Sequence, residues 1–382
     1  MTDTSVGIAM NGVTGRMGRN QHLARSIVAI RDEGGVELAN GDRIVPSPIL
    51  VGRDSAKLKD LAAEFSVERW TTDLDEVLSD PAVDIYFDSQ LTSLRATAVE
   101  SAIAAGKAVY CEKPLAEDLE SARQLADLAG KSGVKNGIVQ DKLFLPGLLK
   151  LRRLIDDGFF GRILSVHGEF GYWVFEGKDE PPQRPAWNYK SDEGGSIILD
   201  MFPHWQYVIE DLFGEIESVS VLATTHIPTR YEEGQPYDAT ADDAAYATFQ
   251  LGNGTIVQIN SSWATRVYRD ELVVFQVDGV EGSAVAGLRE CRQQARSATP
   301  RPVWNPDVPN PIDFRAGWLE VDADRDPDNA FRVQWEAFLR HVVADEPFPW
   351  DFSHGARGLE LVDAAMRSWQ ERRWVDLSEV TR

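Results

Sequence analysis

Residues 6–18, VGIAMNGVTGRMG, decide the fold of the first part of the chain. Residues 6–10 form a short apolar run, which is typical of a buried strand. Gly12, Gly15 and Gly18 follow it, and the next residues suit a helix. A strand, a glycine-rich turn and a helix in this order predict a dinucleotide-binding turn, because glycines let backbone N–H groups approach a pyrophosphate at the positive end of the helix. The spacing is GxxGxxG and not the commoner GxGxxG, so the prediction depends on the flanking elements.

Strands and helices alternate from residue 1 to about residue 145, which predicts a parallel, doubly wound sheet. The predicted strands are 6–10, 49–52, 85–88, 108–111 and 137–139. The predicted helices are 15–30, 55–65, 73–78, 92–105 and 121–131. Residues 33–48 make a longer polar link than usual, and we expect a small excursion there.

The end of the second strand is where such a fold distinguishes its cofactors. Arg53 and then Asp54 follow the apolar residues 48–52. An acidic residue at this place binds the ribose 2′-hydroxyl of NAD, whereas an arginine suits the 2′-phosphate of NADP. Because Arg53 comes first, NADP is mildly favoured. NAD stays open, since Arg53 can instead stack on the adenine or face water.

Glu112, Lys113 and Pro114 follow the apolar strand 108–111. Ligands of a doubly wound fold bind outside the carboxyl ends of the strands, so we expect Lys113 at the ligand edge. An ammonium group there can hold a substrate hydroxyl and stabilise an alkoxide during hydride transfer. A surface lysine at a strand end is the alternative, and Pro114 favours a fixed bend of the backbone.

Residues 194–205, GGSIILDMFPHW, place Asp200 and His204 four residues apart. On a helix these side chains share one face, about 5–6 Å apart at Cβ. A carboxylate beside an imidazole is a general-base arrangement, because the acid can orient the ring and the ring can take a proton near neutral pH. A solvated pair is the alternative. Pro203 favours a helix that begins near Asp200, where first-turn N–H groups have no partner in any case.

After a predicted helix at 146–157, the pattern changes to strands with a period of two. These strands are 163–170, 218–225, 244–250, 255–262 and 271–277, and LGNG at 251–254 predicts a hairpin turn between two of them. Polar Gln258, Asn260 and Ser262 alternate with inward residues, so one face can meet water or another subunit. We therefore predict an α/β chain. A Rossmann domain spans 1–145, and an α+β domain with a large, mostly antiparallel open sheet spans 146–382.

Two loops have an unusual composition. Residues 172–189, YWVFEGKDEPPQRPAWNY, combine Trp173, Arg184 and Trp187 with prolines. Aromatic faces stack on sugar C–H groups and polar tips bind hydroxyls, so this loop is a candidate substrate lid. Packing of the same rings onto the core is the alternative. Residues 292–311 are rich in proline, and we expect an ordered excursion near the site or an interface.

The composition argues against several classes of protein. The 382 residues suffice for two domains, and a net charge of −22 opposes binding to nucleic acid or anionic membranes. Two cysteines do not make a disulfide framework, and Cys111 suits a core thiol at the end of a strand. The chain opens with no signal-peptide pattern and has no long apolar run, which predicts a cytoplasmic protein. The histidines lack zinc-ligand spacing, so we expect no metal.

The glycine turn, the EKP sequence at 112–114 and the GG–D–H segment together resemble the Gfo/Idh/MocA oxidoreductases, which include glucose–fructose oxidoreductase and inositol dehydrogenase. Residues 158–170 and 358–377 also resemble family segments, so the resemblance covers nearly the whole length. It implies that Lys113 is the catalytic-site lysine and that His204 is the general base. Asp200 would orient His204 or bind a neighbouring hydroxyl. The resemblance also implies homodimers or homotetramers.

The resemblance implies ligand contacts as well. We expect cofactor contacts from Gly12, Thr14, Gly15, Arg16, Met17, Gly18, Arg53, Glu112 and Lys113. We expect substrate contacts from Lys142, Trp173, Arg184, Trp187, Asp200 and His204. The chain departs from the family at residues 86–95, YFDSQLTSLR, which lack the proline, asparagine and histidine of a TPNxxH turn. Lys142 replaces an arginine of the family.

We therefore predict an NAD- or NADP-dependent oxidoreductase that transfers a hydride between nicotinamide and a hydroxyl-bearing carbon of a sugar, a sugar derivative or a cyclic polyol. One alternative is an NAD-dependent glycosidase, which oxidises a sugar hydroxyl transiently, eliminates the aglycone and returns the hydride from a tightly bound cofactor. Another is a nucleotide-binding regulator without activity, against which the presence of Lys113, Asp200 and His204 together argues.

Overall fold

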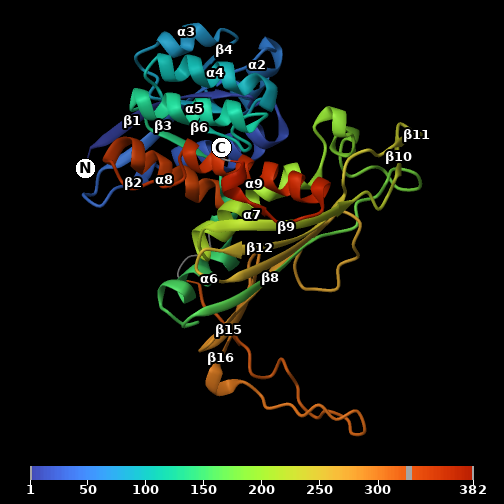
Figure 1. Ribbon diagram of the computed structural model, residues 1–382. Coiled ribbons are helices and arrows are strands. Elements are labelled where there is room, and N and C mark those ends of the chain that lie inside the picture. Colours follow the sequence, from blue (N-terminus) through green and yellow to red (C-terminus); the bar gives the residue numbers. More distant parts are fainter. Residues whose placement is uncertain (1, 324–328, 381–382) are drawn as a thin grey trace. The chain divides into compact units, whose positions relative to one another are not determined.

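The computed structural model describes residues 2–323 and 329–380, which divide into two compact units (Figure 1). The first unit contains residues 2–144 and 329–359, and the second contains residues 145–323 and 360–380. The sequence pattern predicted a second domain from residue 146 to residue 382, whereas residues 329–359 return to the first unit. They do so because helix α8 (Ala330–Ala344) supplies aromatic side chains to the first core.

The first unit is built on a seven-stranded sheet with β1 (Asp3–Asn11) near its middle. The strand order is β2–β3–β1–β5–β6–β7, and β4 also pairs with β3. The other bounds are β2 (Val36–Glu37), β3 (Arg43–Val51), β4 (Arg69–Thr71), β5 (Ile85–Asp88), β6 (Ala108–Cys111) and β7 (Asn136–Ile138). All these pairings are parallel except that of β2 with β3, so the predicted doubly wound parallel sheet is confirmed.

The expected excursion at 33–48 is wrong in its second half. The strand β3 begins at Arg43, and the short β2 pairs with its start in antiparallel orientation. Because Pro46 and Pro48 disfavour a strand, the first part of β3 was not predicted from the sequence. They lie between the pairings of β2 and β4, where β3 has an open edge, and proline is tolerated at such an edge.

The helices of the first unit cover both faces of the sheet. A continuous helix from residue 16 to residue 32 follows β1, and its central part, η1 (Gly18–Val28), has π-helical hydrogen bonding before α1 (Ala29–Asp32). The helices η1, α1 and α8 lie on one face, and α4 and α5 lie on the other (Figure 1). The remaining bounds are α2 (Ser55–Glu64), α3 (Leu74–Ser79), α4 (Thr92–Ala104), α5 (Leu119–Ser132) and the 3-10 turn η2 (Asp141–Phe144).

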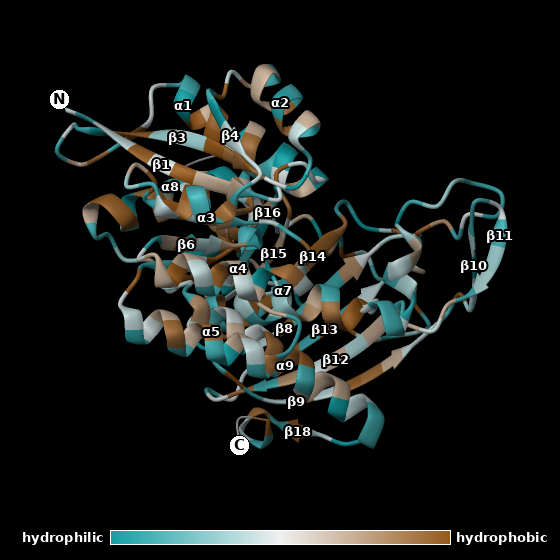
Figure 2. Cartoon of the chain, turned by 90° about the horizontal axis from the view of Figure 1, so that it is seen from above, coloured by the Kyte–Doolittle hydropathy of each residue, from teal (hydrophilic) through white to brown (hydrophobic). Residues whose placement is uncertain are grey.

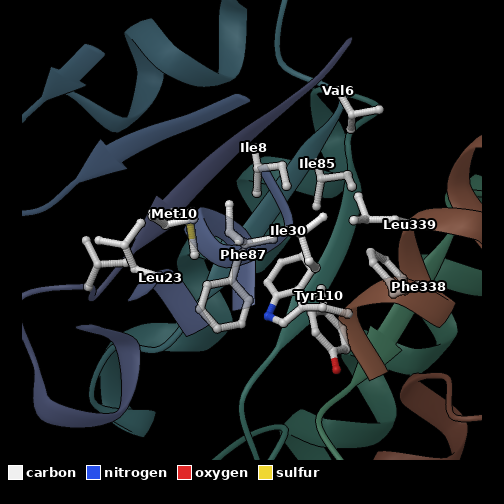
Figure 3. Packing of buried hydrophobic residues seen from close by; sticks show 14 of the residues in the cluster. Val6, Ile8, Met10, Leu23, Ile30, Ile85, Phe87, Tyr110, Phe338 and Leu339 are labelled. Atoms are coloured by element: carbon white, nitrogen blue, oxygen red, sulfur yellow. The ribbon is translucent and has the colours of Figure 1, made fainter. Parts of the chain in front are cut away.

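The core under η1 and α8 is dense in aromatic and branched side chains. Figure 3 shows Ile8, Met10 and Phe87 of the sheet facing Leu23 of η1, with Phe338 of α8 nearby. The Phe338 ring stacks on Tyr110 with centroids 4.6 Å apart, and both rings are buried. Full burial of one such side chain stabilises the fold by about 1.5–3 kcal/mol, so α8 is an integral part of this core.

The second unit contains a nine-stranded sheet in the order β17–β16–β15–β14–β8–β13–β12–β9–β18. Only β8 and β13 pair in parallel, so the predicted mostly antiparallel sheet is confirmed. The strand bounds are β8 (Ile163–Gly171), β9 (Ile216–Thr224), β12 (Ala244–Leu251), β13 (Ile256–Ser262), β14 (Val273–Gly279), β15 (Gly282–Gly287), β16 (Cys291–Ala295), β17 (Leu319–Glu320) and β18 (Val375–Asp376). A separate, largely hydrophilic hairpin consists of β10 (Thr229–Glu232) and β11 (Gln235–Asp238) (Figure 2).

The two faces of this sheet differ, as the alternation predicted. Helix α7 (Ile197–Leu212) packs against one face, where Trp205 contacts Phe170 and Phe275 and donates a hydrogen bond to Ser261. The opposite face exposes polar residues and holds a shallow concavity of about 610 Å³. Its lining includes His167, Glu169, Leu222, Tyr246, Gln258 and Asn260. The other helices of this unit are α6 (Pro146–Asp156), the second part of α9 (Phe352–Glu371) and the 3-10 turns η3 (Ala186–Tyr189), η4 (Ser191–Glu193), η5 (Arg296–Ala298) and η6 (Leu377–Glu379).

Two local expectations in the second unit are wrong. Helix α7 begins at Ile197 and not near Asp200, because the Ser196 side chain caps it by accepting from the N–H groups of Ile198 and Leu199. Pro203 therefore lies in the helix interior, where it deprives the Leu199 carbonyl of its usual donor. The proline-rich excursion is shorter than 292–311, since its first residues belong to β16 and η5.

The chain within 2–323 and 329–380 contains no helix that is both long enough and apolar enough to cross a membrane.

We expect Phe338→Ala to lower the free energy of unfolding by about 3–5 kcal/mol, because it opens a cavity in the core that α8 completes. The matched control is Leu128→Ala on α5, where the side chain is 38% exposed and the expected change is within about 0.5 kcal/mol. Urea unfolding followed by tryptophan fluorescence measures both. Equal midpoints for the two variants would show that α8 does not contribute to the first core.

Candidate active site

The parallel register of the first unit brings most of its predicted site residues to one edge. Asn11 at the end of β1 lies opposite Val51 of β3 and Asp88 of β5. In the same way Asp88 lies opposite Cys111 of β6, and Cys111 lies opposite Ile138 of β7. The glycine turn, Arg53, Glu112, Lys113 and Lys142 come directly after these strand ends. They therefore share the carboxyl edge, where doubly wound sheets bind ligands.

The three positions of the turn need glycine for different structural reasons. Gly12 has φ +84°, and a Cβ there would lie 2.5 Å from the Ser89 backbone. A Cβ on Gly18 would lie 2.5 Å from Ser89 Oγ. Gly15 is exposed, and the nearest atom to its Cβ would be Gly12 O at 3.3 Å. The absence of a side chain at Gly12 and Gly18 thus lets the turn after β5 pack closely against them. The backbone at Gly15 is exposed and can be approached by a ligand.

The residues around Gly15 fit a dinucleotide. Thr14 and Arg16 are exposed beside it, and Met17 is half-buried at the start of the helix. The turn precedes a helix of several turns, whose first N–H groups and dipole favour a phosphate. The exposed turn and the start of the helix are therefore compatible with a bound phosphate group.

Asp54 and Arg53 have separate roles. The Asp54 carboxylate caps α2 by accepting from Ala56 N and Lys57 N, both at 3.1 Å. The hydrogen bond from Lys57 N is the main reason that the pKa of Asp54 is lowered. The Arg53 side chain is exposed at the end of β3.

Glu112 is held inside the protein. Its Oε1 lies 2.7 Å from His22 Nε2, and its Oε2 accepts from Lys113 N at 3.0 Å. Burial by itself raises the pKa of Glu112, but the hydrogen bond from His22 and nearby positive charges outweigh burial, so the pKa is lowered. The carboxylate is thus ionised and fixes the backbone of Lys113. The peptide bond between Lys113 and Pro114 is cis.

A buried ion pair between Asp88 and Arg95 lies in the segment 86–95, which lacks the TPNxxH turn of the family. Asp88 and Arg95 are 0% and 2% exposed, and Arg95 Nε lies 3.0 Å from Asp88 Oδ1. Tyr86 Oη and Gln90 Nε2 also donate to Asp88, at 2.7 and 2.8 Å. The sequence analysis did not find this network. The signal was an acidic residue at the end of an apolar strand with an arginine seven residues later.

Lys142 lies in η2, just after β7, and its Nζ is 3.5 Å from Asp141 Oδ2. The neighbouring Gln140 is buried and hydrogen-bonded to Gln334 and His354, which belong to the returning C-terminal segment. Lys142 thus follows a strand end that the C-terminal segment holds in place.

In the second unit the structure brings Arg184 of the candidate lid to Asp200 of α7. Arg184 Nη1 lies 3.1 Å from Asp200 Oδ2. The guanidinium also stacks over the Trp263 ring at 4.2 Å from its centroid and contacts Tyr172 Oη at 3.4 Å. Burial lowers the pKa of Arg184, but the Asp200 charge and the Tyr172 contact outweigh burial and raise it. The loop 172–189 is therefore anchored to α7 by an ion pair.

His204 is 5% exposed, and its Nδ1 lies 2.6 Å from Tyr207 Oη. Tyr207 was not predicted, although its spacing of three residues on a helix was a visible signal. This hydroxyl is placed to orient the imidazole ring.

The two tryptophans of the lid differ. Trp173 is half-buried, and Arg266 stacks over its ring at 4.1 Å from the centroid. Trp187 lies in η3 and is 49% exposed. Tyr189 is buried at the end of η3 beside Trp263, and burial raises its pKa to about 12. Part of this loop therefore packs on the unit, while the Trp187 ring remains open to solvent.

The two cysteines are buried and unpaired. Burial raises the pKa of the Cys111 thiol well above its ordinary value, as expected for a core thiol and not for a nucleophile. In residues 2–323 and 329–380, no three His, Cys, Asp or Glu side chains gather as metal ligands do.

Two glycine variants separate the structural part of the turn from its ligand-binding part. We expect Gly12→Ala to destabilise the fold by more than about 1–2 kcal/mol, because it adds a clash to a left-handed backbone. Gly15→Ala should melt near the wild type but bind NADH about tenfold more weakly, because the added methyl group occupies the exposed side of the turn that a pyrophosphate would approach. Thermal denaturation and NADH fluorescence titration measure the two effects. Unchanged NADH affinity in Gly15→Ala would remove the turn from the cofactor site.

Comparison with known proteins agrees with both units. Residues 6–139 match the NAD-binding Rossmann-fold domain of the GFO/IDH/MocA oxidoreductase family, and residues 148–285 match the C-terminal domain of that family. A D-xylose dehydrogenase of Paenarthrobacter nicotinovorans is 54% identical over 387 aligned residues, which cover 100% of each chain. An inositol 2-dehydrogenase of Rhizobium meliloti is 26% identical and covers 83% of this chain and 87% of its own.

Solved structures share the fold. A levoglucosan dehydrogenase in complex with NADH and L-sorbose aligns with TM-score 0.80 and 20% identity over 99% of this chain and 100% of its own. An NAD-binding oxidoreductase from Klebsiella pneumoniae aligns with TM-score 0.81 and 23% identity over 98% and 99%. The chain therefore belongs to the GFO/IDH/MocA family of oxidoreductases, whose N-terminal domain is an NAD-binding Rossmann fold.

Proposed function

We propose that the chain oxidises the hydroxyl of a monosaccharide with NAD or NADP, and that D-xylose is the substrate to test first. The relative that is 54% identical along the whole chain is a D-xylose dehydrogenase. The observation that carries the proposal is the shared edge of the glycine turn and Lys113, which combines a phosphate-binding turn with an ammonium group. The cofactor, when bound, supplies the hydride acceptor.

His204 acts as the general base in this proposal. Its Nε2 can take the hydroxyl proton only if Nδ1 carries the other ring proton, and Nδ1–H can then donate to Tyr207 Oη, 2.6 Å away. A tyrosine hydroxyl can accept this hydrogen bond, so the contact with Tyr207 orients the ring and is compatible with the tautomer that the reaction needs. The Lys113 ammonium donates to a substrate oxygen and steadies the negative charge that develops there.

Asp200 binds a neighbouring hydroxyl instead of moving the proton. Its carboxylate pairs with Arg184, and a carboxylate has further lone pairs that accept hydrogen bonds from sugar hydroxyls. Arg184, Trp187 and Lys142 complete the set of substrate contacts, and Trp187 offers an exposed ring for a sugar face. Trp173 also belongs to this set, although its ring already contacts Arg266.

The cofactor contacts in this proposal come from the glycine turn, with Thr14, Arg16 and Met17, and from Arg53, Glu112 and Lys113. Arg53 mildly favours NADP, since Asp54 is engaged in capping α2.

We expect Arg53→Ala to weaken NADP binding by about ten- to a hundredfold, the value of one or two hydrogen bonds between charged groups, and to leave NAD binding within about twofold. Fluorescence titration with NADPH and NADH measures this ratio. Equal losses for the two cofactors would mean that Arg53 contacts the adenine and not the 2′-phosphate.

We propose a cytoplasmic homodimer or homotetramer. The open face of the second sheet supports self-association, because Leu222 and Tyr246 are 54% and 41% exposed among polar neighbours. Buried, unpaired cysteines suit a reducing compartment.

The catalytic roles are tested by Lys113→Ala and His204→Ala. We expect kcat to fall by about 100- to 10,000-fold in each, as for the loss of an acid–base or charge-stabilising group, and NADH affinity to fall far less. The matched control is Lys131→Ala on α5, whose side chain is 79% exposed.

Formation of the reduced nicotinamide with D-xylose is the readout. Undiminished turnover in both site variants would eliminate the assigned residues. Release of nitrophenol from an aryl glycoside without net cofactor reduction would identify a glycosidase. Cofactor binding without turnover of any sugar would identify a regulator.

A further inference from the structure

A chain of buried side chains connects helix α8 to the Lys113 turn, which we define as residues 112–114. Trp335 Nε1 of α8 donates to His22 Nδ1 at 3.0 Å. His22 Nε2 lies 2.7 Å from Glu112 Oε1, and Lys113 N donates to Glu112 Oε2 at 3.0 Å. His22 and Trp335 are 0% exposed and Glu112 is 8% exposed. This hydrogen-bonded chain of Trp335, His22 and Glu112, which we call the relay, thus runs through the protein interior from the C-terminal segment to the turn.

The relay selects one form of His22. An indole N–H is only a donor, so His22 Nδ1 must accept and the ring proton must lie on Nε2. Nε2–H then donates to the Glu112 carboxylate. A second ring proton on Nδ1 would face the Trp335 N–H group. His22 is therefore held as the neutral Nε2–H tautomer, which gives Glu112 a donor in a fixed direction.

A second set of buried contacts holds the other side of the turn. Arg95 Nη1 donates to the Pro114 carbonyl, Nε pairs with Asp88 at 3.0 Å, and Nη2 donates to the Gln90 carbonyl at 3.2 Å. Its side chain is 2% exposed. A planar guanidinium can reach three acceptors in fixed directions, which a lysine cannot do.

The Lys113 turn is thus fixed from both directions. The relay holds the backbone N–H of Lys113 through Glu112, and Arg95 holds the carbonyl of Pro114. A lysine has a long, flexible stem, so the direction in which its ammonium leaves the sheet edge depends on how firmly its backbone is held.

We propose that His22 and Arg95 are positioning residues for Lys113, and that Trp335 acts through His22 by donating a hydrogen bond to its Nδ1. This inference rests on the proposed role of Lys113. It makes the returning C-terminal segment part of the active-site machinery of the first unit, and not only of its core. Neither His22 nor Arg95 touches the reacting atoms in this proposal.

The first measurement is the ¹⁵N NMR spectrum of histidine-labelled protein, with His22→Asn used for assignment. We expect His22 of the wild type to show a protonated Nε2 and an unprotonated Nδ1. Trp335→Phe keeps an aromatic ring but removes the donor, so the Nδ1 signal of its His22 should shift as that hydrogen bond is lost, while Nε2 stays protonated against Glu112. A protonated Nδ1 in the wild type would overturn the relay.

The second measurement separates positioning from folding. With D-xylose and NAD⁺, we expect Trp335→Phe and Arg95→Lys to lower kcat about tenfold, because a misplaced ammonium stabilises the transition state poorly. The KM for D-xylose and the affinity for NADH should change less than about threefold, since neither variant removes a binding group. The matched control is Phe331→Leu on α8, which removes a ring 5.1 Å from His22 but no hydrogen bond, and its kcat should stay within about twofold.

The outcomes distinguish this inference from the proposed function. If Lys113→Ala lowers kcat while Trp335→Phe and Arg95→Lys do not, the positioning role is wrong and the assignment of Lys113 stands. If Lys113→Ala leaves kcat unchanged, the proposed function loses its lysine and this inference falls with it. A loss in Phe331→Leu equal to that in Trp335→Phe would show a packing effect and overturn the relay.

Discussion

Parallel strand pairing is the constraint on which the site of the first unit depends. In a parallel sheet all the strands end at the same edge, so residues far apart in the chain become neighbours if each follows a strand. The glycine turn, Arg53, Asp88 and Lys113 are such residues, and the register that joins β1, β3, β5 and β6 aligns their positions. No side-chain attraction is needed to gather them. The hydrogen-bonded ladder does so.

The same edge creates an energetic problem that the buried polar network answers. Charged groups lose water when strand ends are covered, and an unpaired buried charge is costly. Asp88 and Glu112 are both buried, and each receives donors from side chains of other segments. Glu112 obtains its donor through His22, which in turn depends on Trp335. The polar groups near Lys113 therefore tie together the first helix, the strand ends and a helix that comes late in the sequence.

Helix α7 of the second unit combines two kinds of side chain. Some of them cover a face of the sheet, and others are polar. Trp205 belongs to the first kind through its contacts with the sheet, whereas Asp200 and His204 belong to the second. Their partners, Arg184 and Tyr207, satisfy the polar groups within the same unit. Polar side chains on a largely buried helix need partners, and Arg184 and Tyr207 are the partners of Asp200 and His204.

The class of the fold, the ends of β5 and β6, the hairpin at 251–254 and the family could all be predicted from the amino-acid sequence, because they depend on local periodicity and on short motifs. The sequence did not reveal β15 and β16, whose glycine, alanine and glutamine residues have low strand propensity and are held by neighbouring strands and α6.

Only the tertiary structure decided which partners the site residues have. The spacing of Asp200 and His204 suggested that Asp200 orients His204. In the structure Asp200 pairs with Arg184 of a loop. A contact between distant segments produces no periodic pattern in the sequence. The return of α8 to the first unit, with Trp335 against His22, was invisible for the same reason: hydrogen bonds between distant segments depend on how the chain packs and not on the order of its residues.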